Sequence, residues 1–310
     1  MTSIGAAAVD LAPNHKVGLA LANPVMPAAG CFGLGTEYAR LVEIEVLGAV
    51  LVGPITARPR RGAEPPRTLP IPGGVLLHTG LANPGVAAVT RRTARAWVRS
   101  PVPILVHVAG TTPEETASCC RRLSGMAAVA GVELGLRDTI DVSTAPAGRT
   151  PGAGPYPYKD NGAGRGLTAA IDDATAVISA AHAATSQPLI VRLPLVWADA
   201  LCEPAVEAGA DALTVAAPPR GTAWHEASER FVTGRLYGPF VLPLALRALR
   251  RVAERVSVPL IGCGGIHSVE DALTFLRAGA TAVQVGGALW RDPASLARIA
   301  RGLSTAVEPR

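Results

Sequence analysis

Short apolar segments recur along the whole chain and alternate with stretches that have helical patterns. Most of them are continuously apolar, which is typical of parallel strands that are buried on both faces. Eight such segments can be counted in the 310 residues, at 25–29, 49–52, 104–109, 132–136, 189–193, 212–216, 259–262 and 282–286. Eight strands that are each followed by a helix predict an α/β fold, with residues 1–310 forming a single (β/α)8 TIM barrel domain.

The seventh and eighth predicted strands both end in paired glycines. Gly264 and Gly265 follow one strand, and Gly286 and Gly287 follow the other. Glycines leave backbone N–H groups accessible, and the loops after strands seven and eight of a barrel are its usual phosphate site. Glycines that only form tight turns are the alternative. We favour a phosphate site, because the feature occurs at two successive strands.

Several helix boundaries are also visible in the sequence. Pro113 precedes two glutamates, and Ser268 precedes an acidic first turn, so helices are predicted to begin at these two places. Gly209 and Gly279 each follow a helical stretch and precede a predicted strand, where they would end the helices.

Two stretches rich in proline and glycine interrupt the alternating pattern. They cover about residues 58–80, after the second predicted strand, and 138–166, after the fourth. Loops that follow barrel strands lie on the face where ligands bind, so we expect long loops here and a mobile lid at 138–166. A disordered insertion is the alternative for part of the second stretch.

The composition excludes several classes of protein. Hydrophobic residues make up 49% of the chain, but no apolar run approaches the roughly 18 residues that cross a bilayer, and no signal peptide is visible. Aromatic residues make up only 4%, which is too few for stacking on nucleic acid bases. The five cysteines lack metal-ligand spacing and are expected to be reduced thiols. These features predict a cytoplasmic protein without nucleic acid, membrane or metal partners.

Three further motifs resemble the class 1 dihydroorotate dehydrogenases. Residues 23–38 read NPVMPAAGCFGLGTEY, residues 58–67 read RPRRGAEPPR, and residues 80–85 read GLANPG. The two glycine-ended strands are similar to the flavin phosphate site of that family, and the resemblance runs from about residue 23 to residue 293. It implies an FMN-containing flavoprotein, an oxidoreductase acting on a small molecule in pyrimidine biosynthesis, and a homodimer.

The resemblance also implies which residues hold the cofactor. Arg192 stands at the end of the fifth strand, where the family has a lysine that contacts the flavin ring. Arginine keeps the positive charge but presents a planar set of donors. The cofactor-binding residues implied are Ala29, Gly30, Arg192, Gly238, Gly264, Gly265, Gly286 and Gly287.

Other positions depart from the pattern of the family. The family has a lysine after strand two where this chain has Gly53, and a loop cysteine where this chain has Asp138. It has an asparagine on strand three where this chain has His107. Three asparagines that bind the substrate in the family correspond to Leu77, Gly135 and Ala217. A site built to hydrogen-bond a polar ring loses affinity when those partners are absent. We therefore expect little dihydroorotate activity. The chain is then either a flavin oxidoreductase for another substrate, or a catalytically degenerate barrel that binds a phosphorylated ligand or acts as an interaction protein.

Three side chains are candidates for chemistry with the substrate. His107 ends a strand and is suited to hydrogen bonding with the flavin or to acid–base catalysis near neutral pH, with a structural role as the alternative. Asp138 occupies the position of the family's loop base, although the neighbouring Arg137 would weaken it. His78 lies in the expected substrate region and is either a ligand or an ordinary loop residue.

Overall fold

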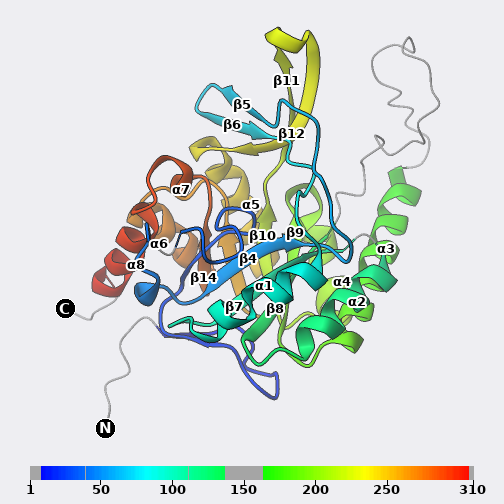
Figure 1. Cartoon of the computed structure of the whole chain (residues 1–310), viewed down its shortest axis with the longest axis vertical. Coiled ribbons are helices and arrows are strands. Elements are labelled where there is room, and N and C mark those ends of the chain that lie inside the picture. The colour runs from blue at the N-terminus through cyan, green and yellow to red at the C-terminus, as the bar shows by residue number, and fades with distance from the viewer. Residues whose placement is uncertain (1–7, 39, 111, 137–162, 307–310) are drawn as a thin grey trace.

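Eight parallel strands form the centre of the molecule. The computed structural model describes residues 8–38, 40–110, 112–136 and 163–306 (Figure 1). The strand order is β3-β14-β13-β10-β9-β8-β7-β4. These strands are β3 (Val25–Pro27), β4 (Val50–Ile55), β7 (Ile104–Ala109), β8 (Val129–Gly135), β9 (Leu189–Pro194), β10 (Ala212–Ala217), β13 (Leu260–Cys263) and β14 (Ala282–Val285). All eight predicted strands are confirmed, with ends that differ by a few residues.

Backbone hydrogen bonds join the two outer strands of this sheet, β3 and β4. The Gly48 N–H donates to the Val25 carbonyl at 2.9 Å, and the Gly30 N–H donates to the Gly53 carbonyl at 3.2 Å. These contacts bring the first strand beside the second. The sheet is therefore a nearly closed barrel, as the sequence predicts.

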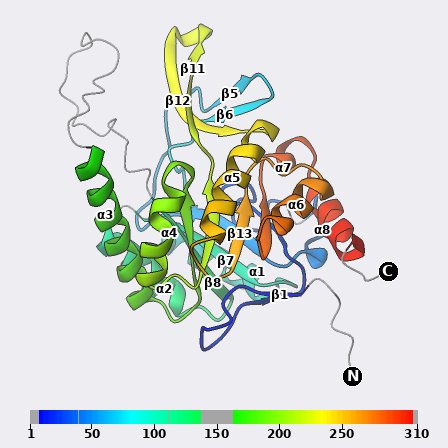
Figure 2. The same ribbon diagram turned by 180° about the vertical axis from the view of Figure 1, so that it is seen from behind.

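Helices surround the barrel on its outside (Figures 1 and 2). They are α1 (Val86–Val98), α2 (Pro113–Ser124), α3 (Ala163–Ala184), α4 (Ala198–Glu207), α5 (Leu242–Ala253), α6 (Val269–Arg277), α7 (Ala288–Arg291) and α8 (Ser295–Ala306). The predicted helix starts at Pro113 and after Ser268 are confirmed, and Ser268 forms a capping box with Asp271. Gly209 and Gly279 both have positive φ angles, of 109° and 107°, as expected for residues that end helices.

The connection between β3 and β4 differs from the expectation that every strand is followed by a helix. Its described residues contain only a single 3₁₀ turn, η1 (Ile44–Val46). Glycines at positions 30, 33 and 35 all have positive φ angles, which a continuing α-helix does not allow. The outer helix layer is therefore incomplete at this point.

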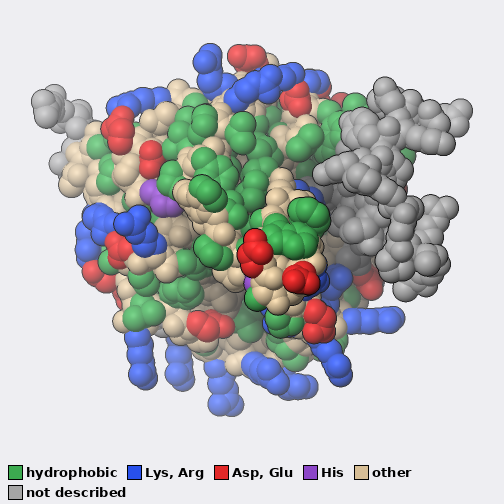
Figure 3. All heavy atoms as spheres, turned by 90° about the horizontal axis from the view of Figure 1, so that it is seen from above, with side chains coloured by type: hydrophobic (Ala, Val, Ile, Leu, Met, Phe, Trp, Pro, Cys, Tyr) green, Lys and Arg blue, Asp and Glu red, His purple; other side chains and the backbone are tan. Residues whose placement is uncertain are grey.

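A small antiparallel sheet stands over the carboxyl ends of the barrel strands (Figures 1 and 2). Its strands are β5 (Thr68–Ile71), β6 (Gly74–Leu77), β11 (Arg220–His225) and β12 (Arg230–Tyr237), in the order β11-β12-β6-β5. The predicted loop at 58–80 is therefore wrong in part, because it contains the β5–β6 hairpin. Hydrophobic side chains gather on this upper face, and cationic side chains project around its rim (Figure 3).

The opposite end of the barrel is closed by a short hairpin of β1 (Val9–Asp10) and β2 (Ala20–Leu21). Leu11, Leu19 and Leu21 are buried there against apolar side chains from inside the barrel. Among the described residues, the barrel interior is therefore covered at this end.

Most of the predicted lid, residues 138–162, lies outside the described residues. Its predicted end at residue 166 is four residues too late, because α3 begins at Ala163. No helix among the described residues is long and apolar enough to cross a membrane.

Candidate flavin site

Side chains inside the barrel change from apolar to polar along the strands. Leu105 and Ile190 belong to the apolar layer near the closed end. Alternate residues of a strand point to the same side, so the residues two positions further on also face inward. Those residues are His107 and Arg192, and the neighbouring strands contribute Glu133, Thr214, Cys263 and Gln284. The result is a buried polar layer across the barrel.

Glu133 lies at the centre of this layer and is completely buried. Its Oε1 accepts hydrogen bonds from His107 Nδ1 at 2.7 Å and Arg192 Nε at 3.0 Å. Its Oε2 accepts from Thr214 Oγ1 at 2.7 Å, Gln284 Nε2 at 2.6 Å and Arg192 Nη2 at 3.4 Å. Four side chains from four other strands therefore converge on one carboxylate.

Glu133 and Arg192 each stabilise the charged form of the other. Burial alone would raise the pKa of Glu133, but the Arg192 charge and the hydrogen bonds from His107 and Arg192 hold that pKa far below its usual range. Burial alone would lower the pKa of Arg192, but Glu133 and the Cys263 thiol raise it. Because an ionised carboxylate only accepts hydrogen bonds, His107 must donate through Nδ1. In the neutral imidazole, Nε2 is then left as an acceptor.

The imidazole of His107 fills the space beside Gly135. A Cβ atom added at position 135 would lie 2.7 Å from both Cε1 and Nε2 of the ring. Position 53 is equally restricted, because Gly53 has a φ of 116° and an added Cβ would lie 2.7 Å from the His107 carbonyl oxygen. The His107 ring therefore fits the space left by Gly135, and Gly53 allows the close approach of the residue 107 backbone.

This fit predicts a coupled response to substitution. Gly135→Asn is expected to destabilise the protein by about 1–3 kcal/mol, the usual range for overpacking a core. His107→Asn removes the ring that causes the clash, so the double variant His107→Asn/Gly135→Asn is expected to recover most of that loss. Urea unfolding of the two single variants and the double variant measures the coupling. Additive effects would contradict the proposed fit.

The two glycine pairs line a common pocket at the carboxyl end of the barrel. Its wall contains Gly264, Gly265, Gly286, Gly287 and, from the polar layer, Arg192. Gly265 has a φ of 73°, and an added Cβ would lie 2.4 Å from the Leu242 backbone nitrogen. An added Cβ at Gly287 would have more room, with its nearest neighbour 3.7 Å away. The pocket thus combines close backbone with a cationic side chain, which suits a phosphorylated ring compound.

Some of the other residues predicted from the sequence lie at this pocket, and others do not. Ala29 and Gly238 line the same pocket, and Gly30 follows Ala29 in the loop after β3. His78 follows β6 in the small sheet, where its N–H donates to the Arg67 carbonyl at 2.7 Å, and it does not line the pocket. Asp138 lies outside the described residues.

Sequence reasoning missed the role of Tyr237 and the residues that surround Arg192. Tyr237 lines the pocket, and its ring packs edge-on against Trp290 with 4.9 Å between the centroids. Burial raises the pKa of Tyr237, so its hydroxyl stays protonated. Burial also raises the pKa of Cys31 to about 12, and raises that of Cys263, in agreement with their interpretation as buried thiols. The two-residue strand period indicates which residues of each strand face inward, but the meeting of Glu133 and Arg192 also depends on the register between strands.

Comparisons with known proteins agree with this geometry. Residues 13–136 and 161–307 match the family model "Dihydroorotate dehydrogenase". The "Dihydroorotate dehydrogenase B (NAD(+)), catalytic subunit" of Pelobacter propionicus is 37% identical over 302 residues, which cover 95% of this chain and 92% of that protein. The protein of the same name from Cutibacterium acnes is 36% identical over 298 residues, covering 92% and 90%.

A solved structure shows the same fold. It is that of a DHODH from Eimeria tenella in complex with ferulenol, with a TM-score of 0.69 and 20% sequence identity, covering 94% of this chain and 83% of that one. The resemblance predicted from the motifs is confirmed by the family model and the relatives. The chain belongs to the dihydroorotate dehydrogenase family and is a dihydroorotate dehydrogenase-like oxidoreductase on a TIM barrel.

Proposed function

We propose that this protein is an FMN-dependent oxidoreductase that dehydrogenates a CH–CH group of a small molecule. The observation that carries the proposal is that both glycine pairs and Arg192 line one pocket. FMN bound there would supply the hydride acceptor. The glycine backbone would hold its phosphate, and Arg192 would lie where the flavin ring carries negative charge after reduction.

Arg192 is suited to this role because its orientation is fixed. Its Nε donates to Glu133, its Nη1 donates to Cys263 Sγ at 3.4 Å, and its Nη2 donates to Gln284. Most of its donors are therefore engaged before a ligand arrives. A guanidinium held in this way loses little conformational entropy on binding and requires no rearrangement during the reaction.

His107 is the proposed proton acceptor or hydrogen-bonding group for the substrate. Glu133 fixes its tautomer, as the base of a catalytic dyad does. Its side chain is only 9% exposed, so its contacts with bulk water are few. Asp138 and His78 remain proposed partners of the substrate on the basis of the family resemblance alone.

The proposed substrate is less polar than dihydroorotate. Gly53, Gly135, Leu77 and Ala217 offer no polar side chain at positions where the resemblance places substrate ligands. Ala217 is buried and Leu77 is partly buried, so an apolar part of a substrate would find matching surface at these positions. We also propose, from the resemblance, that the protein is cytoplasmic and forms a homodimer.

A carboxylate in the proposed phosphate cradle is expected to weaken FMN binding by at least about 100-fold. Gly287→Asp is the suitable change, because Gly287 has φ −55° and room for a Cβ atom. Two like charges about 4 Å apart repel by about 4 kcal/mol near a protein surface. FMN affinity is measured by fluorescence titration of the apoprotein.

Gly125→Asp is the matched control for this prediction. Gly125 is exposed at the end of α2, and nothing lies within 4 Å of its added Cβ atom. Its FMN affinity is expected to equal that of the parent protein. A folded Gly287→Asp variant with unchanged affinity would show that the phosphate binds elsewhere. A protein that cannot be loaded with FMN under any condition would favour the catalytically degenerate barrel.

A further inference from the structure

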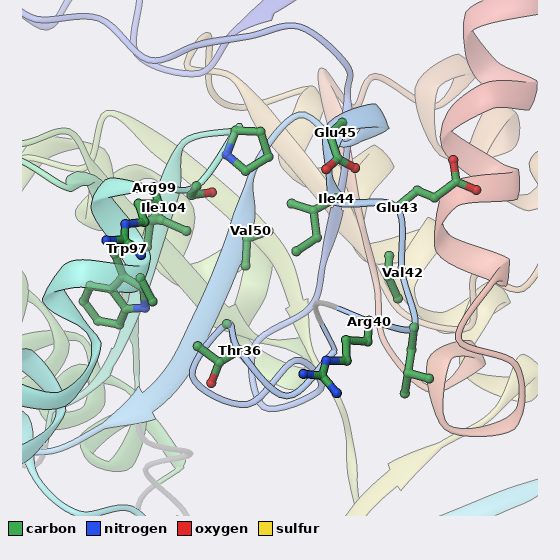
Figure 4. Close-up of a pocket in the computed structure, with 15 residues that line it drawn as sticks. Thr36, Arg40, Val42, Glu43, Ile44, Glu45, Val50, Trp97, Arg99 and Ile104 are labelled. Carbon is green, nitrogen blue, oxygen red and sulfur yellow. The ribbon is translucent and has the colours of Figure 1, made fainter.

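A second hollow, of about 500 Å³, opens on the outside of the barrel (Figure 4). It lies beside the β3–β4 connection, where the described residues contain the 3₁₀ turn η1 but no α-helix. Val50 and Ile104, the first residues of β4 and β7, line it together with Trp97 of α1 and Ile44 of η1. The missing helix thus leaves a hollow with a mixed polar and apolar lining near the amino ends of these strands, away from the flavin pocket.

One side of the hollow continues into a row of arginines on α1. Arg91, Arg95 and Arg99 are spaced four residues apart, so they lie on one face of the helix, and all three are exposed. The row extends for roughly 12 Å, at about 1.5 Å per residue. Helix α1 contains no aspartate or glutamate. None of the three arginines forms an ion pair within the described part of the chain.

The hollow itself is lined by two arginines and two glutamates. Arg40 and Arg99 both line it, and Arg40 likewise has no ion pair among the described residues. Of the two acidic lining residues, Glu43 turns toward α8 and is already paired with Arg301, whereas Glu45 lies on the side opposite Arg40 (Figure 4). The unpaired charges around the hollow are therefore mostly cationic.

Two large aliphatic side chains are exposed beside these arginines. Leu41 lines the hollow and is 60% exposed, and Val98, between Trp97 and Arg99 on α1, is 70% exposed. Exposed aliphatic side chains beside a hollow are typical of protein-binding surfaces, and arginine is enriched at such surfaces.

We propose that this surface, formed by the hollow and the arginines of α1, binds an acidic segment of a partner protein. One large apolar side chain of the segment occupies the hollow, and its carboxylates lie along Arg91, Arg95 and Arg99. Charge complementarity is the reason for choosing an acidic segment, because a row of unpaired cations favours an anionic partner. The length of the row favours an extended segment over a small anion, which would contact one arginine at a time. The inference is independent of the flavin site.

The test uses a photo-crosslinking amino acid, p-benzoylphenylalanine, in place of Val98 in cells that naturally make the full chain. We expect one crosslinked protein, joined through a segment with at least three acidic residues within about ten positions. The affinity of that purified protein is then measured for the parent chain and for Arg95→Glu/Arg99→Glu. We expect the variant to bind at least about 10-fold more weakly, and the parent affinity to fall with added salt.

Arg247→Glu/Arg250→Glu on α5 is the matched control, since both residues are exposed arginines on another helix. Its affinity for the partner is expected to change less than twofold, and both variants are expected to keep the FMN content of the parent. Crosslinks only to a second copy of this chain, only to lipid, or to a segment without acidic residues would each overturn the proposal. An absence of crosslinks, or equal weakening by the control variant, would also overturn it.

Discussion

FMN-loaded protein is expected to turn over dihydroorotate more slowly than about 1 s⁻¹, the low end of ordinary enzymes. Transition-state stabilisation is distributed over the groups that contact a substrate, and losing several of them costs many orders of magnitude in rate. The family resemblance implies such groups at the positions that hold Gly53, Leu77, Gly135 and Ala217 in this chain. The measurement is an assay with dihydroorotate and several electron acceptors.

Two of these positions are sterically restricted in the structure. Gly53 has a left-handed backbone that disfavours lysine, and Gly135 lies against the ring of His107. A single substitution such as Gly135→Asn is therefore not expected to restore activity. Chemical reduction of the bound flavin serves as the control that the cofactor is competent. Turnover of dihydroorotate at about 1 s⁻¹ or faster would contradict the prediction.

Glu133→Gln is expected to lower the free energy of unfolding by about 3–5 kcal/mol, because it leaves the buried charge of Arg192 unpaired. The amide also places an NH₂ group among side chains that donate hydrogen bonds to Glu133. Urea denaturation at neutral pH measures the change. Glu270→Gln is the matched control, because Glu270 pairs with Arg277 on the exposed surface and such pairs contribute less than about 1 kcal/mol.

The same substitution should change the response to acid. The depressed pKa of Glu133 in the folded protein means that the unfolded chain takes up the proton first, near pH ~4.3. Glu133 therefore contributes stability above that pH and loses the contribution as the pH falls below it. The free energy of unfolding of the Glu133→Gln variant is therefore expected to fall less steeply with decreasing pH than that of the parent protein. Equal stability of the two proteins at neutral pH would contradict the assignment of Glu133 as the centre of the layer.

The barrel was predictable because its strands are buried on both faces. Segments such as Leu260–Cys263 are continuously apolar, and that pattern is visible without knowledge of their neighbours. The small sheet lacks this signal. Arg220–His225 alternates between exposed and half-buried residues, and Thr68–Ile71 contains Pro70. The glycines at positions 30, 33 and 35 are the sequence signal for the missing helix after β3, because closely spaced glycines disfavour a helix.

The candidate site likewise has a part that the sequence predicts and a part that it does not. Each glycine pair is visible in the sequence at the end of a predicted strand. The two strands are neighbours in a barrel, so the fold predicts that the two pairs lie close together. Glu133 and Arg192 lie 59 residues apart, and their contact depends on the tilt and register of strands that the sequence does not display. The fit of His107 to Gly135 also joins two strands, and local patterns contain no steric information across strands.

The visible absorption spectrum of the purified protein shows whether the pocket formed by the two glycine pairs and Arg192 holds FMN. We predict a yellow protein with the absorption bands of oxidised flavin and about one FMN per chain, either as purified or after reconstitution. A colourless protein whose addition leaves the spectrum and fluorescence of free FMN unchanged would contradict it.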